Sequence, residues 1–66
     1  MTPTISIIIP TLNEAPLIEN LLQRLSQYFP GEEIIVADGG STDNTVSLAQ
    51  RFARILLGHP GFFREL

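Results

Sequence analysis

The sequence predicts an α/β fold in which strands and helices alternate in the order β-α-β-α-β. Two apolar runs, Thr4 to Ile9 and Glu33 to Ala37, have the density of β-branched residues that strands favour. Each run is followed by turn-forming residues and then by apolar residues at helical spacing. A third short run, residues 55–57, follows the second helical pattern. This alternation predicts a parallel sheet with right-handed crossovers, as in one half of a doubly wound fold.

The first strand is expected to be buried on both faces. Ile7, Ile8 and Ile9 are consecutive, whereas a strand with one solvated face alternates apolar and polar residues. Pro10 has no backbone N–H to donate, so we expect it to end the strand.

The first helix is expected to begin at Glu14, with Asn13 as its N-cap and Pro16 in its first turn. Pro30 and Gly31 should stop it. Its apolar face follows the helical period and consists of Leu17, Ile18, Leu21, Leu22, Leu25, Tyr28 and Phe29.

The second strand ends at Asp38, and a cluster of capping residues follows. We expect Ser41, Thr42 or Asp43 to cap a second helix with apolar positions at Val46, Leu48, Ala49, Phe52 and Ala53. Residues 58–61 should form a turn after the third strand. Residues 62–66 show no pattern, and we expect them to be a non-native tail on a truncated domain.

Composition excludes several classes of function. The chain of 66 residues carries a net charge of −3, and its four basic residues are all arginines, which disfavours a nucleic-acid or anionic-membrane partner. It has no cysteine and one histidine, which excludes disulfides, thiolate zinc sites and cysteine nucleophiles. No apolar run approaches the ~18 residues that span a bilayer, and the N-terminus lacks the basic region of a secretory signal. We therefore expect a cytoplasmic protein with no metal site in these residues.

Two loops are the candidates for ligand binding, because ligands of parallel sheets bind beyond the carboxyl ends of the strands. These loops are residues 10–14 and 38–43. The Asp38 carboxylate suits hydrogen bonds from a base or a ribose, and Gly39 and Gly40 permit close approach of a flat ligand. The same residues also suit an ordinary turn, so both interpretations stay open. Asp43 places a negative charge at the start of the second helix, which disfavours a phosphate there.

Three common motifs are absent. The dinucleotide-binding fingerprint needs Gly-x-Gly-x-x-Gly after the first strand, whereas residues 10–16 contain no glycine. The Walker phosphate loop needs a lysine, and the chain has none. No Gly-x-Ser-x-Gly elbow of a hydrolase occurs.

Two segments resemble a known family. Residues 6–14, Ser-Ile-Ile-Ile-Pro-Thr-Leu-Asn-Glu, and residues 33–45, Glu-Ile-Ile-Val-Ala-Asp-Gly-Gly-Ser-Thr-Asp-Asn-Thr, look like the N-terminus of family 2 glycosyltransferases. These enzymes have the GT-A fold, and the resemblance covers roughly residues 4 to 61.

The resemblance implies transfer of a sugar from a nucleotide-diphosphate sugar, most often a UDP-sugar, to an acceptor. It also implies that the two loops hold the nucleotide's base and ribose through Pro10, Thr11, Asn13, Glu14, Asp38, Gly39, Gly40 and Ser41. Many members carry a second acid where this chain has glycine at position 39. The family's Asp-x-Asp motif for Mn or Mg and its catalytic base lie on later segments, and no Asp-x-Asp occurs here. We therefore expect the nucleotide-binding half of an enzyme, inactive alone. The alternative is a non-catalytic nucleotide-binding or inert truncated product.

The resemblance also implies that the first strand's other neighbour comes from a later segment. The run from Ile5 to Ile9 is then an apolar edge without charge, which pairs readily with another chain. We expect self-association through this edge.

Overall fold

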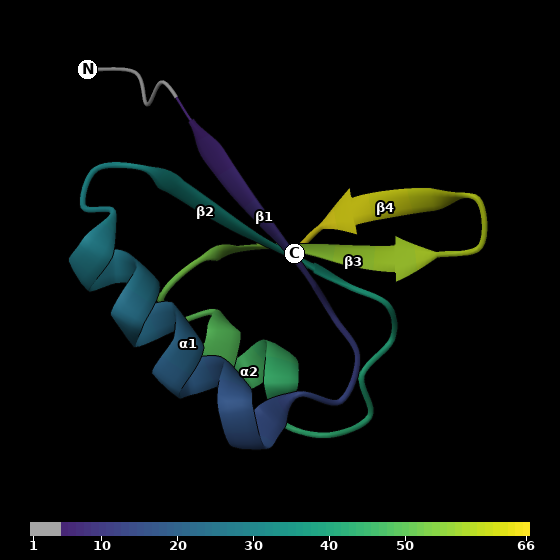
Figure 1. The fold of residues 1–66 in the computed structure, drawn as a ribbon. Coiled ribbons are helices and arrows are strands. Elements are labelled where there is room, and N and C mark those ends of the chain that lie inside the picture. The colour runs from purple at the N-terminus through teal and green to yellow at the C-terminus, as the bar shows by residue number, and fades with distance from the viewer. Residues whose placement is uncertain (1–4) are drawn as a thin grey trace.

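The computed structural model describes residues 5–66, which form a four-stranded sheet with two helices (Figure 1). In chain order the elements are β1 (Ser6–Thr11), α1 (Ala15–Tyr28), β2 (Glu33–Asp38), α2 (Thr45–Ala49), β3 (Arg54–His59) and β4 (Phe62–Glu65). The strand order is β1-β2-β3-β4, with β1, β2 and β3 parallel and β4 antiparallel to β3. The predicted β-α-β-α-β order with a parallel sheet is confirmed. Thr4, placed in the predicted first strand, lies outside the described residues.

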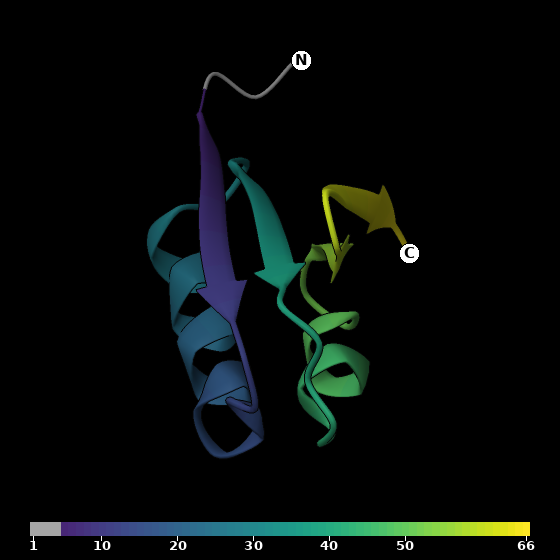
Figure 2. The ribbon, with the colours of Figure 1, turned by 90° about the vertical axis from the view of Figure 1, so that its right-hand side faces the viewer.

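Both helices cover the same face of the sheet (Figures 1 and 2). Successive parallel strands joined by crossovers of one hand place their helices on one side. The buried core lies between these helices and the sheet, and consists of Ile18, Leu22, Ile34, Val36, Ala49 and Ile55.

The expectation that β1 is buried on both faces is wrong. Side chains alternate across a strand, and the burial of β1 alternates accordingly. Ile7 and Ile9 are half-buried, whereas Ile8 is 63% exposed. Because neither helix lies on the second face, Ile8 and its neighbour Ile35 belong to an uncovered apolar surface.

The expectation that Pro10 ends the first strand is also wrong. β1 continues through Pro10, opposite Ala37, to Thr11, opposite Asp38. Along β1, the carbonyls of Ile5 and Thr11 accept hydrogen bonds from β2 and the residue after it. Backbone groups alternate in direction along a strand, so the Pro10 nitrogen points to the open edge. No ladder bond is lost there, which is where strands accept proline.

Asn13 is not the cap of α1, contrary to the sequence prediction. The helix begins at Ala15, and Glu14 occupies the N-cap position without a side-chain cap bond. Asn13 adopts the left-handed backbone region with φ of 54°, and its side chain bonds to Thr42 instead. Pro16 lies in the first turn as predicted.

The second helix is shorter than its apolar pattern suggested, since α2 comprises only five residues. Asn44 occupies its N-cap position without a side-chain cap bond. Of the three expected caps, Asp43 accepts the backbone N–H of Thr45 at 3.0 Å. Asp43, one of the three predicted caps, therefore bonds the first residue of α2 from the position before the N-cap.

Residues 62–65 form β4, for which the sequence showed no pattern. β4 packs closely on β3 at Gly58, where a Cβ atom would lie 3.0 Å from the Asp38 carbonyl oxygen and 3.2 Å from the Phe63 ring. A larger residue at position 58 would therefore make close contacts with the Asp38 backbone and the Phe63 ring, which would have to shift by a few tenths of an ångström. The expectation that residues 62–66 are a non-native tail stays a prediction.

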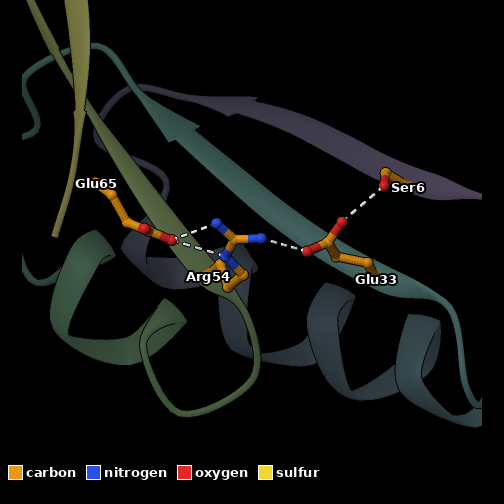
Figure 3. Close-up of polar contacts among 4 residues, drawn as sticks. All are labelled: Ser6, Glu33, Arg54 and Glu65. Atoms are coloured by element: carbon orange, nitrogen blue, oxygen red, sulfur yellow. Dashed lines mark hydrogen bonds and ion pairs between the residues drawn. The ribbon is translucent and has the colours of Figure 1, made fainter. Parts of the chain in front are cut away.

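A row of polar side chains crosses all four strands on the uncovered face (Figure 3). The Ser6 hydroxyl donates to Glu33 at 2.8 Å, and Arg54 donates to Glu33 at 2.5 Å and to Glu65 at 2.7 Å. The Ser6 hydrogen bond and then Arg54 lower the pKa of Glu33. The Arg54–Glu65 pair joins β3 to β4, but it contributes little to stability because both side chains are more than half exposed. Within residues 5–66, no helix is long and apolar enough to cross a membrane.

Candidate functional site

The two predicted ligand loops lie together at the carboxyl ends of β1 and β2. The parallel register places Thr11 opposite Asp38, and the Gly39 N–H donates to the Thr11 carbonyl at 2.9 Å. The two chain segments therefore leave the sheet side by side.

Asp38 is the buried centre of this region, at 1% exposure. One carboxylate oxygen accepts the Thr11 hydroxyl at 2.8 Å and the Ser41 hydroxyl at 2.5 Å. The other accepts the backbone N–H groups of Gly40 at 3.0 Å and Ser41 at 2.8 Å. The turn needs glycine at position 40, where φ is +112°. Asp38 thus has both oxygens filled by partners in its own chain.

The pKa of Asp38 lies below its usual range. Burial raises the pKa, because it disfavours the charged form. The hydrogen bonds oppose this effect, led by the Ser41 hydroxyl and followed by the Ser41 N–H, Thr11 and Gly40, and together they outweigh it. The group is therefore an ionised acceptor at neutral pH.

Asn13 links the first loop to the second. Its backbone N–H donates to the Ser41 hydroxyl oxygen at 2.8 Å, and its side-chain carbonyl accepts the Thr42 N–H at 2.8 Å. Ser41 consequently bonds both Asp38 and Asn13, so the two loops form one hydrogen-bonded unit.

A second link joins the starts of the two helices. The Asp43 carboxylate accepts the N–H of Ala15, at the start of α1, at 3.2 Å, and that of Thr45, at the start of α2, at 3.0 Å. The Thr45 hydroxyl donates to Asp43 and accepts the Glu14 N–H, the latter at 2.8 Å. The Thr45 hydroxyl is the main cause that lowers the pKa of Asp43. The Asp43 carboxylate therefore lies at the start of α2, where the sequence predicted its charge to disfavour a phosphate, and it also accepts a hydrogen bond from the start of α1.

A small pocket of about 200 Å³ opens between β1 and α1. Three predicted residues, Pro10, Thr11 and Glu14, line it together with Ile9, Leu17, Ile18 and Leu21. The Glu14 carboxylate has no hydrogen-bond or ion-pair partner within residues 5–66. Of the two acids predicted to bind the ligand, Asp38 has both carboxylate oxygens hydrogen-bonded within residues 5–66, whereas the oxygens of Glu14 are available to accept hydrogen bonds from a ligand.

The structure places seven of the eight predicted site residues in two groups that share Thr11. Thr11, Asn13, Asp38, Gly40 and Ser41 belong to the hydrogen-bonded unit, and Pro10, Thr11 and Glu14 line the pocket. Gly39 bonds only through its backbone to Thr11.

Sequence reasoning missed that Thr45 bonds Glu14 of the first loop and that Asp43 bonds Ala15 at the start of α1, as well as their own helix. The available signal was the run of five polar residues at 41–45, which is longer than one helix cap uses.

The described residues do not fit a divalent metal. Residues 5–66 contain no group of three or more His, Cys, Asp or Glu side chains that could hold an ion. The Asp38 and Asp43 carboxylates are surrounded by N–H and O–H donors, which a cation would have to displace. The metal implied by the family resemblance has no ligand set in this part of the chain.

Comparison with known proteins identifies the family. The family model described as glycosyl transferase family 2 matches residues 6–64, which include both loops and most of β4. The chain belongs to glycosyl transferase family 2. The α/β sheet of the described residues fits a partial GT-A fold of this family.

Curated relatives of this family 2 chain come from several pathways. A PGL/p-HBAD biosynthesis glycosyltransferase of Mycobacterium bovis is 44% identical over 52 residues, which are 77% of this chain and 20% of the relative. The succinoglycan biosynthesis protein ExoA of Rhizobium meliloti is 45% identical over 49 residues, 71% of this chain and 15% of the relative. A glucosyl-3-phosphoglycerate synthase of Mycobacterium tuberculosis is 46% identical over 44 residues, 64% of this chain and 14% of the relative. The family 2 chain thus spans a fifth or less of these relatives, and no solved structure matches it.

Proposed function

We propose that this chain is the donor-nucleotide half of a family 2 glycosyltransferase. In this proposal, the base and ribose of a nucleotide-diphosphate sugar, a UDP-sugar first, bind at residues 10–14 and 38–41. One observation carries the proposal: the two loops are held as a single unit at the carboxyl ends of β1 and β2. This is where parallel sheets bind their ligands.

The residues have different roles in this proposal. Asp38 is a positioning residue, because its two oxygens already accept four hydrogen bonds and hold Gly40 and Ser41 in place. Glu14 contacts the ligand, because its carboxylate is open and lines the pocket. A carboxylate accepts hydrogen bonds from the N–H of a pyrimidine base or from ribose hydroxyls. The pocket of about 200 Å³ is smaller than the about 300–1,000 Å³ of drug-sized sites, and suits a base rather than a whole nucleotide.

Sugar transfer needs more than this half supplies. A leaving diphosphate is stabilised by a metal or a cationic clamp, and an acceptor hydroxyl needs a general base. We propose that a longer family 2 protein brings these groups, including Mn or Mg, on other segments. The alternative is that the chain binds a nucleotide without catalysing a reaction, or that it is an inert truncated product. The cytoplasmic location stays a prediction.

Titration with UDP tests the proposal. The expected dissociation constant of the 66-residue chain is millimolar, about −4 kcal/mol, because only the base and ribose find contacts. Glu14→Gln is expected to weaken binding several-fold. The matched control is Glu19→Gln, which removes the same charge from the part of α1 that pairs with Arg51 and is expected to leave binding unchanged. Absence of binding at ~10 mM UDP, or micromolar binding that survives both Glu14→Gln and Asp38→Ala, would contradict the assignment.

A further inference from the structure

Three consecutive backbone N–H groups at the start of α1, those of residues 13–15, donate to side chains between β2 and α2. The acceptors are, in order, Ser41 at 2.8 Å, Thr45 at 2.8 Å and Asp43 at 3.2 Å. Pro16 follows and has no N–H to satisfy. The N-cap of α1 makes no side-chain cap bond of its own. The donors that a helix start leaves free are therefore bonded from the second loop, which lies beside the first (Figures 1 and 2).

Thr45 is at the centre of these contacts, with its side chain fully buried at 0% exposure. Its hydroxyl hydrogen is donated to Asp43, so the hydroxyl oxygen is left to accept the Glu14 N–H. Asp43 is held in turn by the Thr45 backbone N–H at 3.0 Å. Asp43 consequently acts on the first loop twice, directly at Ala15 and through the Thr45 hydroxyl at Glu14.

The backbone of the first loop needs such support. Asn13 has φ of 54°, in the left-handed region that residues other than glycine rarely adopt. Glu14 follows with φ of −108° and ψ of 19°, outside the helical conformation. Because the backbone at these two residues sets the direction of the Glu14 side chain, its N–H bond to Thr45 also fixes where the carboxylate points.

We propose that Thr45 and Asp43 are positioning residues of the nucleotide site. Through the N–H groups of Glu14 and Ala15 they hold the first loop in its binding conformation, without contacting the ligand themselves. This inference rests on the proposed function, in which Glu14 contacts the nucleotide. A ligand that meets a loop already held in place does not lose binding free energy in ordering it. All the contacts involved lie within residues 13–45.

Hydrogen exchange of the Glu14 amide tests the loop without any nucleotide. Thr45→Val replaces the hydroxyl by a methyl group and leaves the Glu14 N–H without its acceptor. The expected result is exchange about fivefold faster at Glu14 than in the wild type, corresponding to the loss of one hydrogen bond. Thr45→Ser keeps a hydroxyl and is expected to restore slow exchange. Asp43→Ala is expected to accelerate the amides of both Glu14 and Ala15.

Titration of the same variants with UDP tests the connection to the ligand. Thr45→Val is expected to raise the dissociation constant about fivefold, and Thr45→Ser is expected to bind as the wild type does. If Thr45 acts through Glu14, adding Thr45→Val to Glu14→Gln causes little further loss of affinity. The two losses are then not additive, which a general loss of stability would not produce.

Ile55→Val is the matched control for stability. It also removes a small group from a buried side chain, at 3% exposure on β3, away from both loops. It is expected to lower the melting temperature and to leave the UDP affinity unchanged, as well as the exchange of the Glu14 amide relative to that of the core amides.

The proposal would be overturned if Thr45→Val left the Glu14 exchange rate or the UDP affinity unchanged. Equal effects of Ile55→Val, or additive losses in the double variant, would overturn it as well. Absence of UDP binding by the wild type would instead refute the proposed function. In that case the exchange rates alone still decide whether Thr45 and Asp43 hold the first loop.

Discussion

Each oxygen of the Asp38 carboxylate accepts two hydrogen bonds, which fixes the turn between β2 and α2. Because an acid at a strand end followed by Gly-Gly-Ser is a distinctive pattern, the sequence predicted Asp38 and Ser41 as candidate site residues. The sequence did not reveal that the acid's partners lie within the chain, because Thr11 is 27 residues away and reaches Asp38 only through the strand register. The ligand contact of Asp38 stays a prediction, and its intrachain hydrogen bonds support the proposal that Asp38 positions the turn.

The first prediction concerns the pH dependence that Asp38 confers. Its pKa is lowered in the folded state, so its ionised form stabilises the protein above the unfolded pKa of about 3.9. This stability is lost as pH falls from there through the folded pKa. Asp38→Asn presents an amide to the donors of the turn and is expected to lower the free energy of unfolding by about 1–3 kcal/mol at pH 7. The difference in the free energy of unfolding between the variant and the wild type should become smaller below pH ~4. Urea unfolding at pH 7, 4 and 3 measures it, and a difference that stays constant would show that the carboxylate's charge is unimportant.

The second prediction separates the two neighbouring glycines. Gly40 has φ of +112°, whereas a Cβ atom at Gly39 would lie at an ordinary 3.6 Å from the Thr11 carbonyl oxygen. Gly40→Ala is expected to cost about 1–3 kcal/mol of stability through backbone strain. Gly39→Ala is expected to be neutral or to stabilise by up to about 1 kcal/mol through the unfolded state. Thermal melting of both variants measures this, and equal effects would contradict the loop geometry.

Among the elements, the two helices depend on each other through Asp43, which accepts backbone N–H groups from the start of both. Asp43→Ala is expected to lower the melting temperature, because it leaves donors at two helix starts without an acceptor. Asn44→Ala is the control, since Asn44 occupies the N-cap position of α2 without a side-chain bond and its loss should have little effect. Comparison of the two melting curves is the measurement. An Asn44 variant as unstable as the Asp43 variant would move the capping role to Asn44.

Elements with strong local patterns were predictable, and those set by long-range geometry were not. The order β1-α1-β2-α2-β3 followed from apolar periodicity and turn residues. β4 was not predicted, because Phe-Phe-Arg-Glu has no alternation and its pairing depends on Gly58 and Arg54 of β3. Pro10 continues β1 because its nitrogen faces away from β2, which no residue in the run itself reveals.

In the molecule as a whole, one face of the sheet carries no covering helix, and neither of its edge strands, β1 and β4, has a second neighbour within residues 5–66. The expected burial of Ile8 was wrong for this reason. A run of isoleucines predicts a strand, but it does not predict which elements cover that strand. The curated relatives are five or more times longer than the stretch they share with this chain.

The fourth prediction is that the 66-residue chain has no transferase turnover with any nucleotide sugar, with or without manganese. The described residues hold no metal ligand set, and the open acid near the pocket, Glu14, belongs in the proposal to nucleotide binding. The measurement is nucleotide diphosphate release in the presence of acceptors. Sustained release that follows the purified protein and requires an acceptor would refute the prediction.

We propose that residues 10–14 and 38–41 form one nucleotide-binding surface, and a map of backbone amide shifts during UDP titration is the decisive experiment. We expect progressive, saturable shifts in both loops together, at Thr11, Asn13 and Glu14 and at Gly39 to Ser41, while β4 amides stay unchanged. Both loops should follow one binding curve, because their hydrogen bonds make them a single unit. Shifts confined to one loop, or centred on the β3–β4 hairpin, would contradict the account.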